Sequence, residues 1–301
     1  MSHGSDSVKS IFFALGANLA IAIAKLAAAI VTGTGSMMAE SIHSMADSGN
    51  QLLLILGLKR SKIPPSAEYP LGHGKAIYFW SFVVALILFS LGGMYSIYEG
   101  IHKLRHPEPL TYPLVAIGVL IFSIVAEGVS LWGCLKEVNK ERRSRSLIQW
   151  FRQSRKSELI VVFGEDFAAM LGLVFALAAV SVTLVTGNPV HDAVGSIVIG
   201  VLLVFIAVFI AIEVKGLLIG QSVEADLEQD MAAFLQKRDE IKALLSIITL
   251  QMGTDVMVAI KASMNRCDSA ADMVAAINAC EKAFKADYPQ IKWIFFEPDV
   301  K

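Results

Sequence analysis

The stretch Gly35–Asn50 carries four polar residues whose spacing could support metal chemistry: Glu40, His43, Asp47 and Asn50. Intervals of 3, 4 and 3 residues place them on one face of a helix. An acidic group in the centre of a bilayer costs about 2.5 to 3.5 kcal/mol on insertion scales, so it is seldom kept without a partner or a function. The spacing predicts His43 and Asp47 as metal ligands, since a tetrahedral zinc site accepts both nitrogen and oxygen. The alternative is a hydrogen-bonded core histidine beside a solvated carboxylate.

The composition is that of an integral membrane protein. Of 301 residues, 55% are hydrophobic and 18% charged, whereas soluble domains carry about 25% charged residues. A net charge of −1 gives no sign of a nucleic-acid partner, and we expect none. The three cysteines, Cys134, Cys267 and Cys280, lack Cys-x-x-Cys spacing, which argues against disulfides or a cysteine metal site.

Apolar runs of about 20 residues, long enough to cross a bilayer, predict an all-α bundle of six transmembrane helices in residues 1–222. The runs are Ser10–Thr32, Met37–Leu58, Tyr78–Ile101, Leu114–Leu135, Leu159–Thr186 and His191–Ile219. Six crossings place both termini on one side of the membrane.

The loops differ in charge, and the difference predicts their orientation. Basic residues are dense after the second helix (59–75) and after the fourth (136–156), and absent from Gly33–Gly35 and Gly187–Val190. By the positive-inside rule, the basic loops and both termini are cytoplasmic, and we expect the bacterial inner membrane. Nucleic-acid binding is an alternative for the loop Lys136–Lys156, but topology and attraction to anionic lipid explain it better.

Residues 223–301 predict a small cytoplasmic α+β domain of ferredoxin-like type. The predicted elements are a helix at Leu227–Lys237, strands at Leu244–Gln251 and Val256–Met264, a helix at Ala270–Phe284 and a strand at Ile291–Glu297. So few strands leave open edges and an open face, which a second copy of the chain would cover.

The fifth apolar run adds Glu165 and Asp166 to the candidate site. Adjacent residues point about 100° apart on a helix, so both cannot face squarely into one small site. We favour Asp166 as a ligand, with Glu165 as a ligand or a proton-carrying neighbour. The alternative is that both pair with basic groups near the helix end.

Three further polar residues in the spans have structural interpretations. Lys25 is expected to compensate an acidic partner. Glu127 could cap a helix, snorkel or serve a proton route. Asp192 stands at the start of the sixth helix, where its charge favours the positive end of the helix dipole.

The chain resembles the cation diffusion facilitator family in several motifs. These are the six spans, the stretch Ala39–Asp47 (Ala-Glu-Ser-x-His-Ser-x-x-Asp), the loop Tyr69–Lys75 (Tyr-Pro-Leu-Gly-His-Gly-Lys) and the tail ending Phe296-Glu-Pro298. The resemblance implies a homodimeric exporter of zinc, or of iron, cobalt or manganese, that works by proton antiport. It also implies a transport site built from the second and fifth helices.

Residue by residue, the resemblance assigns His43 and Asp47 as the paired ligands of the second helix and Asp166 as the distal aspartate of the fifth. Val162 stands where the family usually has a fourth ligand. Glu165 resembles the residue of a branch that carries Glu-Asp at this place, which implies that it substitutes for the missing fourth ligand.

Two regions depart from the family pattern. In the loop only His73 remains of what often forms a secondary site, with Glu68 as a candidate helper. In the tail, Lys261 and Phe295 stand where zinc-binding members tend to carry histidines. We therefore expect the tail to dimerise and to bind metal weakly or not at all.

Proton antiport has a simple chemical basis, because protons and metal compete for the same deprotonated ligands. Two other classes are weighed against the transporter. A non-transporting subunit or metal sensor would keep the fold. An intramembrane metalloenzyme would need an open coordination position, and no His-Glu-x-x-His motif is present, so we expect neither enzymatic activity nor a resident cofactor.

Overall fold

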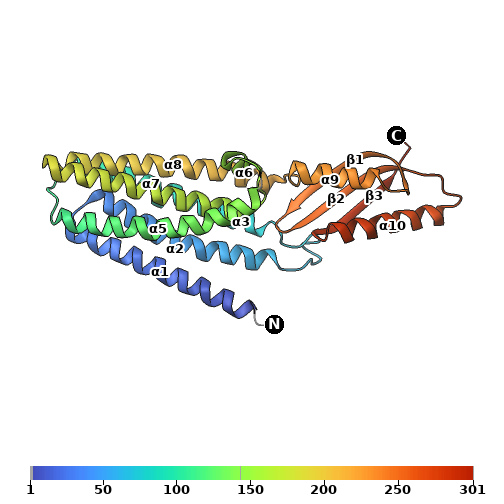
Figure 1. Ribbon diagram of the computed structural model, residues 1–301, viewed down its shortest axis with the longest axis horizontal. Coiled ribbons are helices and arrows are strands. Elements are labelled where there is room, and N and C mark those ends of the chain that lie inside the picture. The colour runs from blue at the N-terminus through green and yellow to red at the C-terminus, as the bar shows by residue number, and fades with distance from the viewer. Residues whose placement is uncertain (1–2, 143, 301) are drawn as a thin grey trace.

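The computed structural model describes the backbone of residues 3–142 and 144–300, with side chains from Asn18 onward. The molecule is elongated, with a bundle of long helices at one end and a small sheet domain at the other (Figure 1). Helix α1 begins on the side of the bundle that faces the sheet domain (Figure 1).

The bundle consists of long helices in the predicted order. They are α1 (His3–Thr32), α2 (Gly35–Ser61), the continuous run α3 (Ala76–Ile87), η1 (Leu88–Met94) and α4 (Tyr95–Arg105), then α5 (Pro113–Arg142), α7 (Ser157–Thr186) and α8 (Val190–Ile219). Within the described part of the chain, four segments are long and apolar enough to cross a membrane: 76–105, 113–142, 157–186 and 190–219. Helix α1 has a shorter apolar part, Asn18–Thr32. Helix α2 carries the polar face described above, which lowers its hydropathy.

A short helix in the basic loop, α6 (Leu147–Gln153), was not predicted. Its start has a reciprocal cap: Gln149 N donates to Ser146 Oγ over 3.2 Å, and Ser146 N donates to Gln149 Oε1 over 3.0 Å. Trp150 is buried and packs edge-on against Phe163 of α7, with ring centroids 5.7 Å apart. The loop therefore contributes packing as well as charge.

Glycines allow α8 to pack closely against the α3–η1–α4 run. A Cβ on Gly93 would lie 2.5 Å from Val204 Cγ2 and 3.0 Å from Val204 N. A Cβ on Gly200 would lie 2.7 Å from the carbonyl oxygen of Gly93. This close approach occurs at the π-helical turn η1.

Gly93→Ala is expected to destabilise the bundle, because the added methyl group meets both the side chain and the backbone of Val204. Such overpacking costs about 1 to 3 kcal/mol, so thermal unfolding in detergent should occur at a lower temperature. Gly118→Ala is the matched control: a Cβ there meets nothing within 4 Å, and the substitution improves helix propensity. Equal melting temperatures for the two variants would contradict this account.

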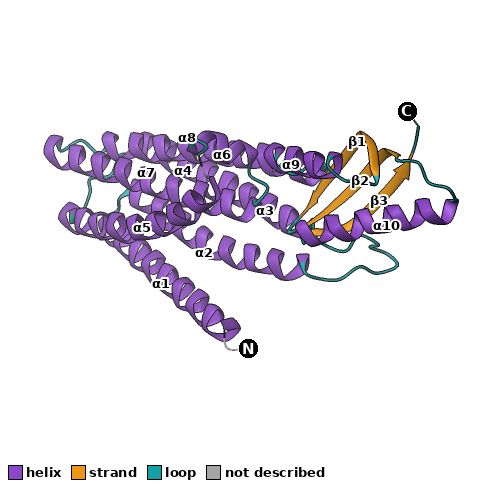
Figure 2. Ribbon diagram, turned by 45° about the vertical axis from the view of Figure 1, so that its right-hand side comes forward, coloured by secondary structure: helices purple, strands orange, loops and turns teal. Residues whose placement is uncertain are grey.

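The sheet domain has the predicted order of elements. Helix α9 (Ala225–Gln236) precedes β1 (Ile241–Met252) and β2 (Asp255–Met264), and α10 (Ala270–Asp287) connects β2 to β3 (Ile291–Pro298). The strand order is β1-β2-β3, with β1 antiparallel and β3 parallel to β2. Figure 2 shows the three strands beside α9 and α10.

The core of this domain lies between the sheet and its helices. Alternate residues of β2, Val258 and Ile260 among them, are buried, as the period of a half-buried strand requires. They pack in one cluster with Met231 and Leu235 of α9 and Phe284 of α10. The opposite face of the sheet carries exposed side chains such as Ile248 and Phe295.

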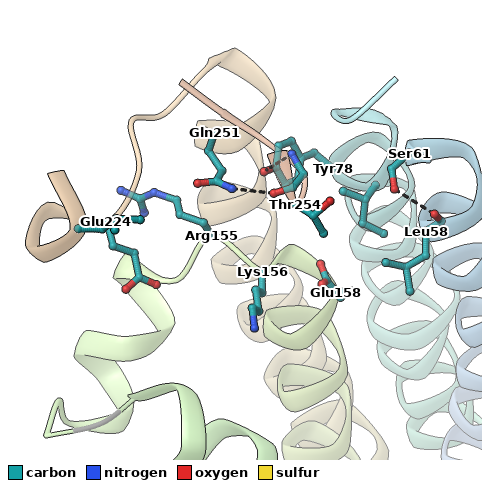
Figure 3. A pocket seen from close by; sticks show the side chains of 12 residues that line it. Leu58, Ser61, Tyr78, Arg155, Lys156, Glu158, Glu224, Gln251 and Thr254 are labelled. Atoms are coloured by element: carbon teal, nitrogen blue, oxygen red, sulfur yellow. Dashed lines mark hydrogen bonds between the residues drawn. The ribbon is translucent and has the colours of Figure 1, made fainter. Parts of the chain in front are cut away.

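Specific polar contacts join the two parts of the molecule. Gly253 N, in the β1–β2 turn, donates to Tyr78 Oη of α3 over 2.9 Å. Arg155 Nε donates to the carbonyl of Ser222 over 2.7 Å, and burial lowers the pKa of this guanidinium. A cavity of about 250 Å³ lies at this junction, lined by Tyr78, Arg155 and Glu224 among others (Figure 3).

Candidate metal site

The N-terminus of α2 is fixed by a carboxylate from α8. Gly35 N donates to Asp192 Oδ2 over 2.6 Å and Ser36 N to Asp192 Oδ1 over 3.2 Å, and Ser36 Oγ also donates to Oδ1. Asp192 is 1% exposed. Its charge lies at the positive end of the α2 dipole. Asp192 stands in the first turn of α8, as predicted, and its carboxylate also caps α2.

His43 and Asp47 face one another on α2, with 3.5 Å between His43 Nε2 and Asp47 Oδ2. The imidazole is fully buried, and neither of its nitrogens has a hydrogen-bond partner among the described residues. Asp47 Oδ1 lacks one in the same part of the chain. A buried polar group without a partner costs about 1 to 3 kcal/mol. These orphaned atoms are therefore suited to an external cation.

The imidazole lies against the π-helical turn. A Cβ built on Gly92 of η1 would lie 3.8 Å from His43 Nδ1. Larger side chains at position 92 would thus crowd the ring. The glycine leaves room beside a buried nitrogen that has no protein partner among residues 18–142 and 144–300.

Glu165 and Asp166 of α7 contact different helices, as their angular separation predicts. Asn50 Nδ2 of α2 donates to Glu165 Oε1 over 2.5 Å. Ser130 Oγ of α5 donates to Asp166 Oδ2 over 3.1 Å. Both carboxylates interact electrostatically with Asp47. The predicted site residues of α2 and α7 are thus neighbours in the fold.

These neighbours do not form a closed coordination shell. In the described part of the chain, no group of three or more His, Cys, Asp or Glu side chains is arranged to hold a metal ion. Val162 of α7 packs against the apolar core of the bundle. The arrangement is a pair of candidate ligands on α2, with two acidic residues of α7 within electrostatic range.

Glu40 shares the helical face of His43 but has a different partner. Its carboxylate Oε2 lies 3.7 Å from Lys25 Nζ of α1, and both side chains are fully buried. Lys25 Nζ also donates to Ser44 Oγ over 2.7 Å and lies 3.7 Å from Glu127 Oε1 of α5. The expected acidic compensation of Lys25 is confirmed. Glu127 is the second acidic partner of Lys25. In the sequence, only its position in the middle of an apolar span marked it as a candidate.

The candidate secondary residues lie in the loop between α2 and α3. His73 contacts the ring of Tyr69, with centroids 4.3 Å apart, and Glu68 is exposed. Neither belongs to a metal-holding group within the described residues.

In the tail, Lys261 forms ion pairs with Asp299 over 2.6 Å and Glu297 over 3.2 Å. The hydrogen bond that Lys261 donates to Asp299, and then the one it donates to Glu297, raise the pKa of this lysine. Phe295 is exposed. Position 261 thus holds a cation that is paired with two carboxylates.

The junction cavity in Figure 3 is distant from this site. It is lined by Leu58 and Ser61 of α2. Leu58 follows Asp47 by eleven residues, which is about 16 Å along the helix at 1.5 Å per residue.

Residues 11–219 match the family model of the cation efflux transmembrane domain. Three curated relatives illustrate the similarity. The proton-coupled zinc antiporter SLC30A9, mitochondrial, of Xenopus laevis is 36% identical over 231 residues, 76% of this chain and 41% of that protein. Metal tolerance protein C4 of Arabidopsis thaliana is 32% identical over 236 residues, covering 78% and 51%. Magnetosome protein MamB of Magnetospira sp. is 24% identical over 228 residues, covering 75% and 72%. The chain thus spans about two fifths of the length of the antiporter.

Proposed function

Because the chain belongs to the cation diffusion facilitator family, we propose that it exports divalent metal ions, zinc first, in exchange for protons. The observation that carries this proposal is the pair His43 and Asp47. Both imidazole nitrogens and Asp47 Oδ1 are buried without a hydrogen-bond partner in the described structure, and Asp47 interacts electrostatically with the acidic pair of α7. The names of the antiporter and metal tolerance relatives support the same activity.

The chemistry follows from the ligands. His43 and Asp47 supply one nitrogen and one oxygen, and Asp166 supplies a third ligand when α7 approaches α2. Val162 leaves the fourth place without a ligand, and Glu165 serves this site either as that fourth ligand or as a proton-carrying neighbour of Asp166. Metal binding requires these groups to be deprotonated, so each metal ion that binds displaces protons.

Zinc is the proposed cargo, with iron(II), cobalt(II) and manganese(II) as alternatives. A set of carboxylates with one imidazole accepts all four, since affinity order alone does not select a metal in cells. We propose neither an enzymatic activity nor a resident cofactor for this site.

The proposed topology has six crossings, with α1 and α2 among them and both termini in the cytoplasm of a bacterium. The start of α1 on the side of the sheet domain supports this arrangement (Figure 1). The names of the animal relatives favour a mitochondrial membrane as the alternative. In intact bacterial cells, a membrane-impermeant maleimide should label Cys267 of the tail only after permeabilisation; labelling of intact cells would contradict the orientation.

We propose that the tail, a ferredoxin-like domain, holds a homodimer together through its open sheet face. Ile248, Ala259 and Phe295 form one row across the three strands. Ile248 and Phe295 are 63% and 56% exposed. Val258 and Ile260 point to the core, so Ala259 between them faces the other way.

Phe295→Asp is expected to convert the dimer to a monomer, because a charge would lie in the apolar row. Light scattering after gel filtration in detergent measures the mass. Val274→Asp is the matched control, since Val274 of α10 is equally exposed, at 54%, but lies outside the row. A dimer that survives Phe295→Asp, or a monomeric wild type, would contradict the proposal.

The second candidate function is a non-transporting subunit or metal sensor, which the incomplete set at Val162 favours. Flux into proteoliposomes separates the two. A transporter moves metal against protons, whereas a subunit or sensor only binds it.

A further inference from the structure

A lysine is buried at the centre of the bundle beside the candidate metal site. Lys25 is 0% exposed and lies seven residues before the end of α1 at Thr32, about 10 Å along the helix. Long basic side chains near helix ends usually reach toward water. Lys25 instead contacts Ser44 and Glu40 of α2 and Glu127 of α5. An ionisable group in this position indicates a function.

The partners of Lys25 alternate with the candidate ligands along α2. Glu40 and Ser44 precede His43 and Asp47, respectively, by three residues. The charge of Lys25 acts on both His43 and Asp47. The ammonium and the metal site therefore share one electrostatic environment.

Glu127 links the same cluster to α7. Its carboxylate interacts electrostatically with Asp47 and with Asp166. Without Lys25, the charges of Glu40 and Glu127 would add to those of Asp47, Glu165 and Asp166 and would hold a divalent cation strongly.

We propose that Lys25 is a built-in counter-cation that weakens metal binding enough for release. This inference rests on the proposed transport function and assigns Lys25 as a positioning residue that does not touch the metal. Its ammonium neutralises part of the charge of Glu40 and Glu127. A unit charge about 10 Å from a divalent ion, at an effective dielectric of about 20, changes affinity by roughly 10- to 100-fold after screening.

The test compares charge variants of the full chain at one fixed pH. Zinc affinity is measured by calorimetry on the detergent-purified protein, and KM and kcat by zinc flux into proteoliposomes. Lys25→Met keeps the length of the side chain and removes its charge. Expected are a 10- to 100-fold lower Kd and KM and a lower kcat, because release slows. Lys25→Arg keeps the positive charge, so its Kd, KM and kcat should stay within a few-fold of the wild-type values.

Glu127→Gln is expected to change zinc affinity in the opposite direction. It removes a negative charge and leaves the ammonium less neutralised, so zinc Kd should rise about tenfold. Lys25→Met/Glu127→Gln restores the balance, and its Kd should return to near the wild-type value. If Lys25→Met alone does not fold, the zinc Kd values of this double variant and of Glu127→Gln still test the inference.

If Lys25 had a purely structural role, the zinc Kd values of the charge variants would not change in these directions. An unchanged or higher Kd in folded Lys25→Met, or an unchanged Kd in Glu127→Gln, would overturn the inference. If the wild type binds and transports zinc while the charge variants match it, this inference alone fails. If the wild type neither binds nor transports any tested metal, the proposed function fails and this inference fails with it.

Discussion

Asp47→Asn is expected to lower zinc affinity by about 100-fold or more and to abolish zinc flux. The substitution keeps the shape of the side chain and removes the charged oxygen that faces His43 at 3.5 Å. Loss of outer partners alone typically costs 10- to 100-fold in metal affinity, and loss of a direct ligand costs more. Calorimetry with zinc and proteoliposome flux measure the two effects.

Ser48→Ala is the control for this prediction. Ser48 is the next residue of α2, is buried, and its hydroxyl donates to the carbonyl of Ser44 over 3.1 Å. The control should bind and transport zinc as the wild type does. Full flux in Asp47→Asn would remove Asp47 from the transport site, however well the protein folds.

Asp192→Ala is expected to destabilise the bundle by roughly 2 to 4 kcal/mol, because each buried donor left unpaired costs about 1 to 3 kcal/mol. The donors Gly35 N and Ser36 N would be left unpaired, and α2 would lose the charge at its N-terminus. Because α2 carries His43 and Asp47, zinc binding should weaken as well. Thermal unfolding in detergent measures the first effect and calorimetry the second.

Two variants bracket the Asp192 prediction. Asp192→Asn keeps an acceptor oxygen and should lose less stability than Asp192→Ala. His191→Ala changes the adjacent, partly exposed residue and should melt with the wild type. If Asp192→Ala also melts with the wild type, the cap does not hold α2 in place.

Helical periodicity predicted which side chains share a face of α2, but not what each one meets. His43 and Asp47 do face one another. Glu40 lies on the same face, yet Lys25 of α1 holds it. Asn50 and Glu165, which form a hydrogen bond with one another, are 115 residues apart in the chain. Spacing within one helix carries no information on such contacts, which depend on how the helices pack.

The same distinction explains the rest of the fold. Alternating apolar residues such as Val258 and Ile260 predicted the strands of the tail, because each strand has one buried face. Helix α6 has seven residues, too few for a periodic signal, although the spacing of Ser146 and Gln149 is that of a helix cap. The π-helical turn η1 packs against α8, and no comparable sequence pattern marks it.

The most direct test of the central claim is metal flux into proteoliposomes that contain the purified full chain and a pH-sensitive dye. Zinc, iron(II), cobalt(II) and manganese(II) are supplied in turn, with Asp166→Ala as the control. The account predicts metal uptake with proton movement in the opposite direction, lost in the control. No flux of any of these metals, in a protein that is folded and dimeric, would contradict it and favour the subunit or sensor.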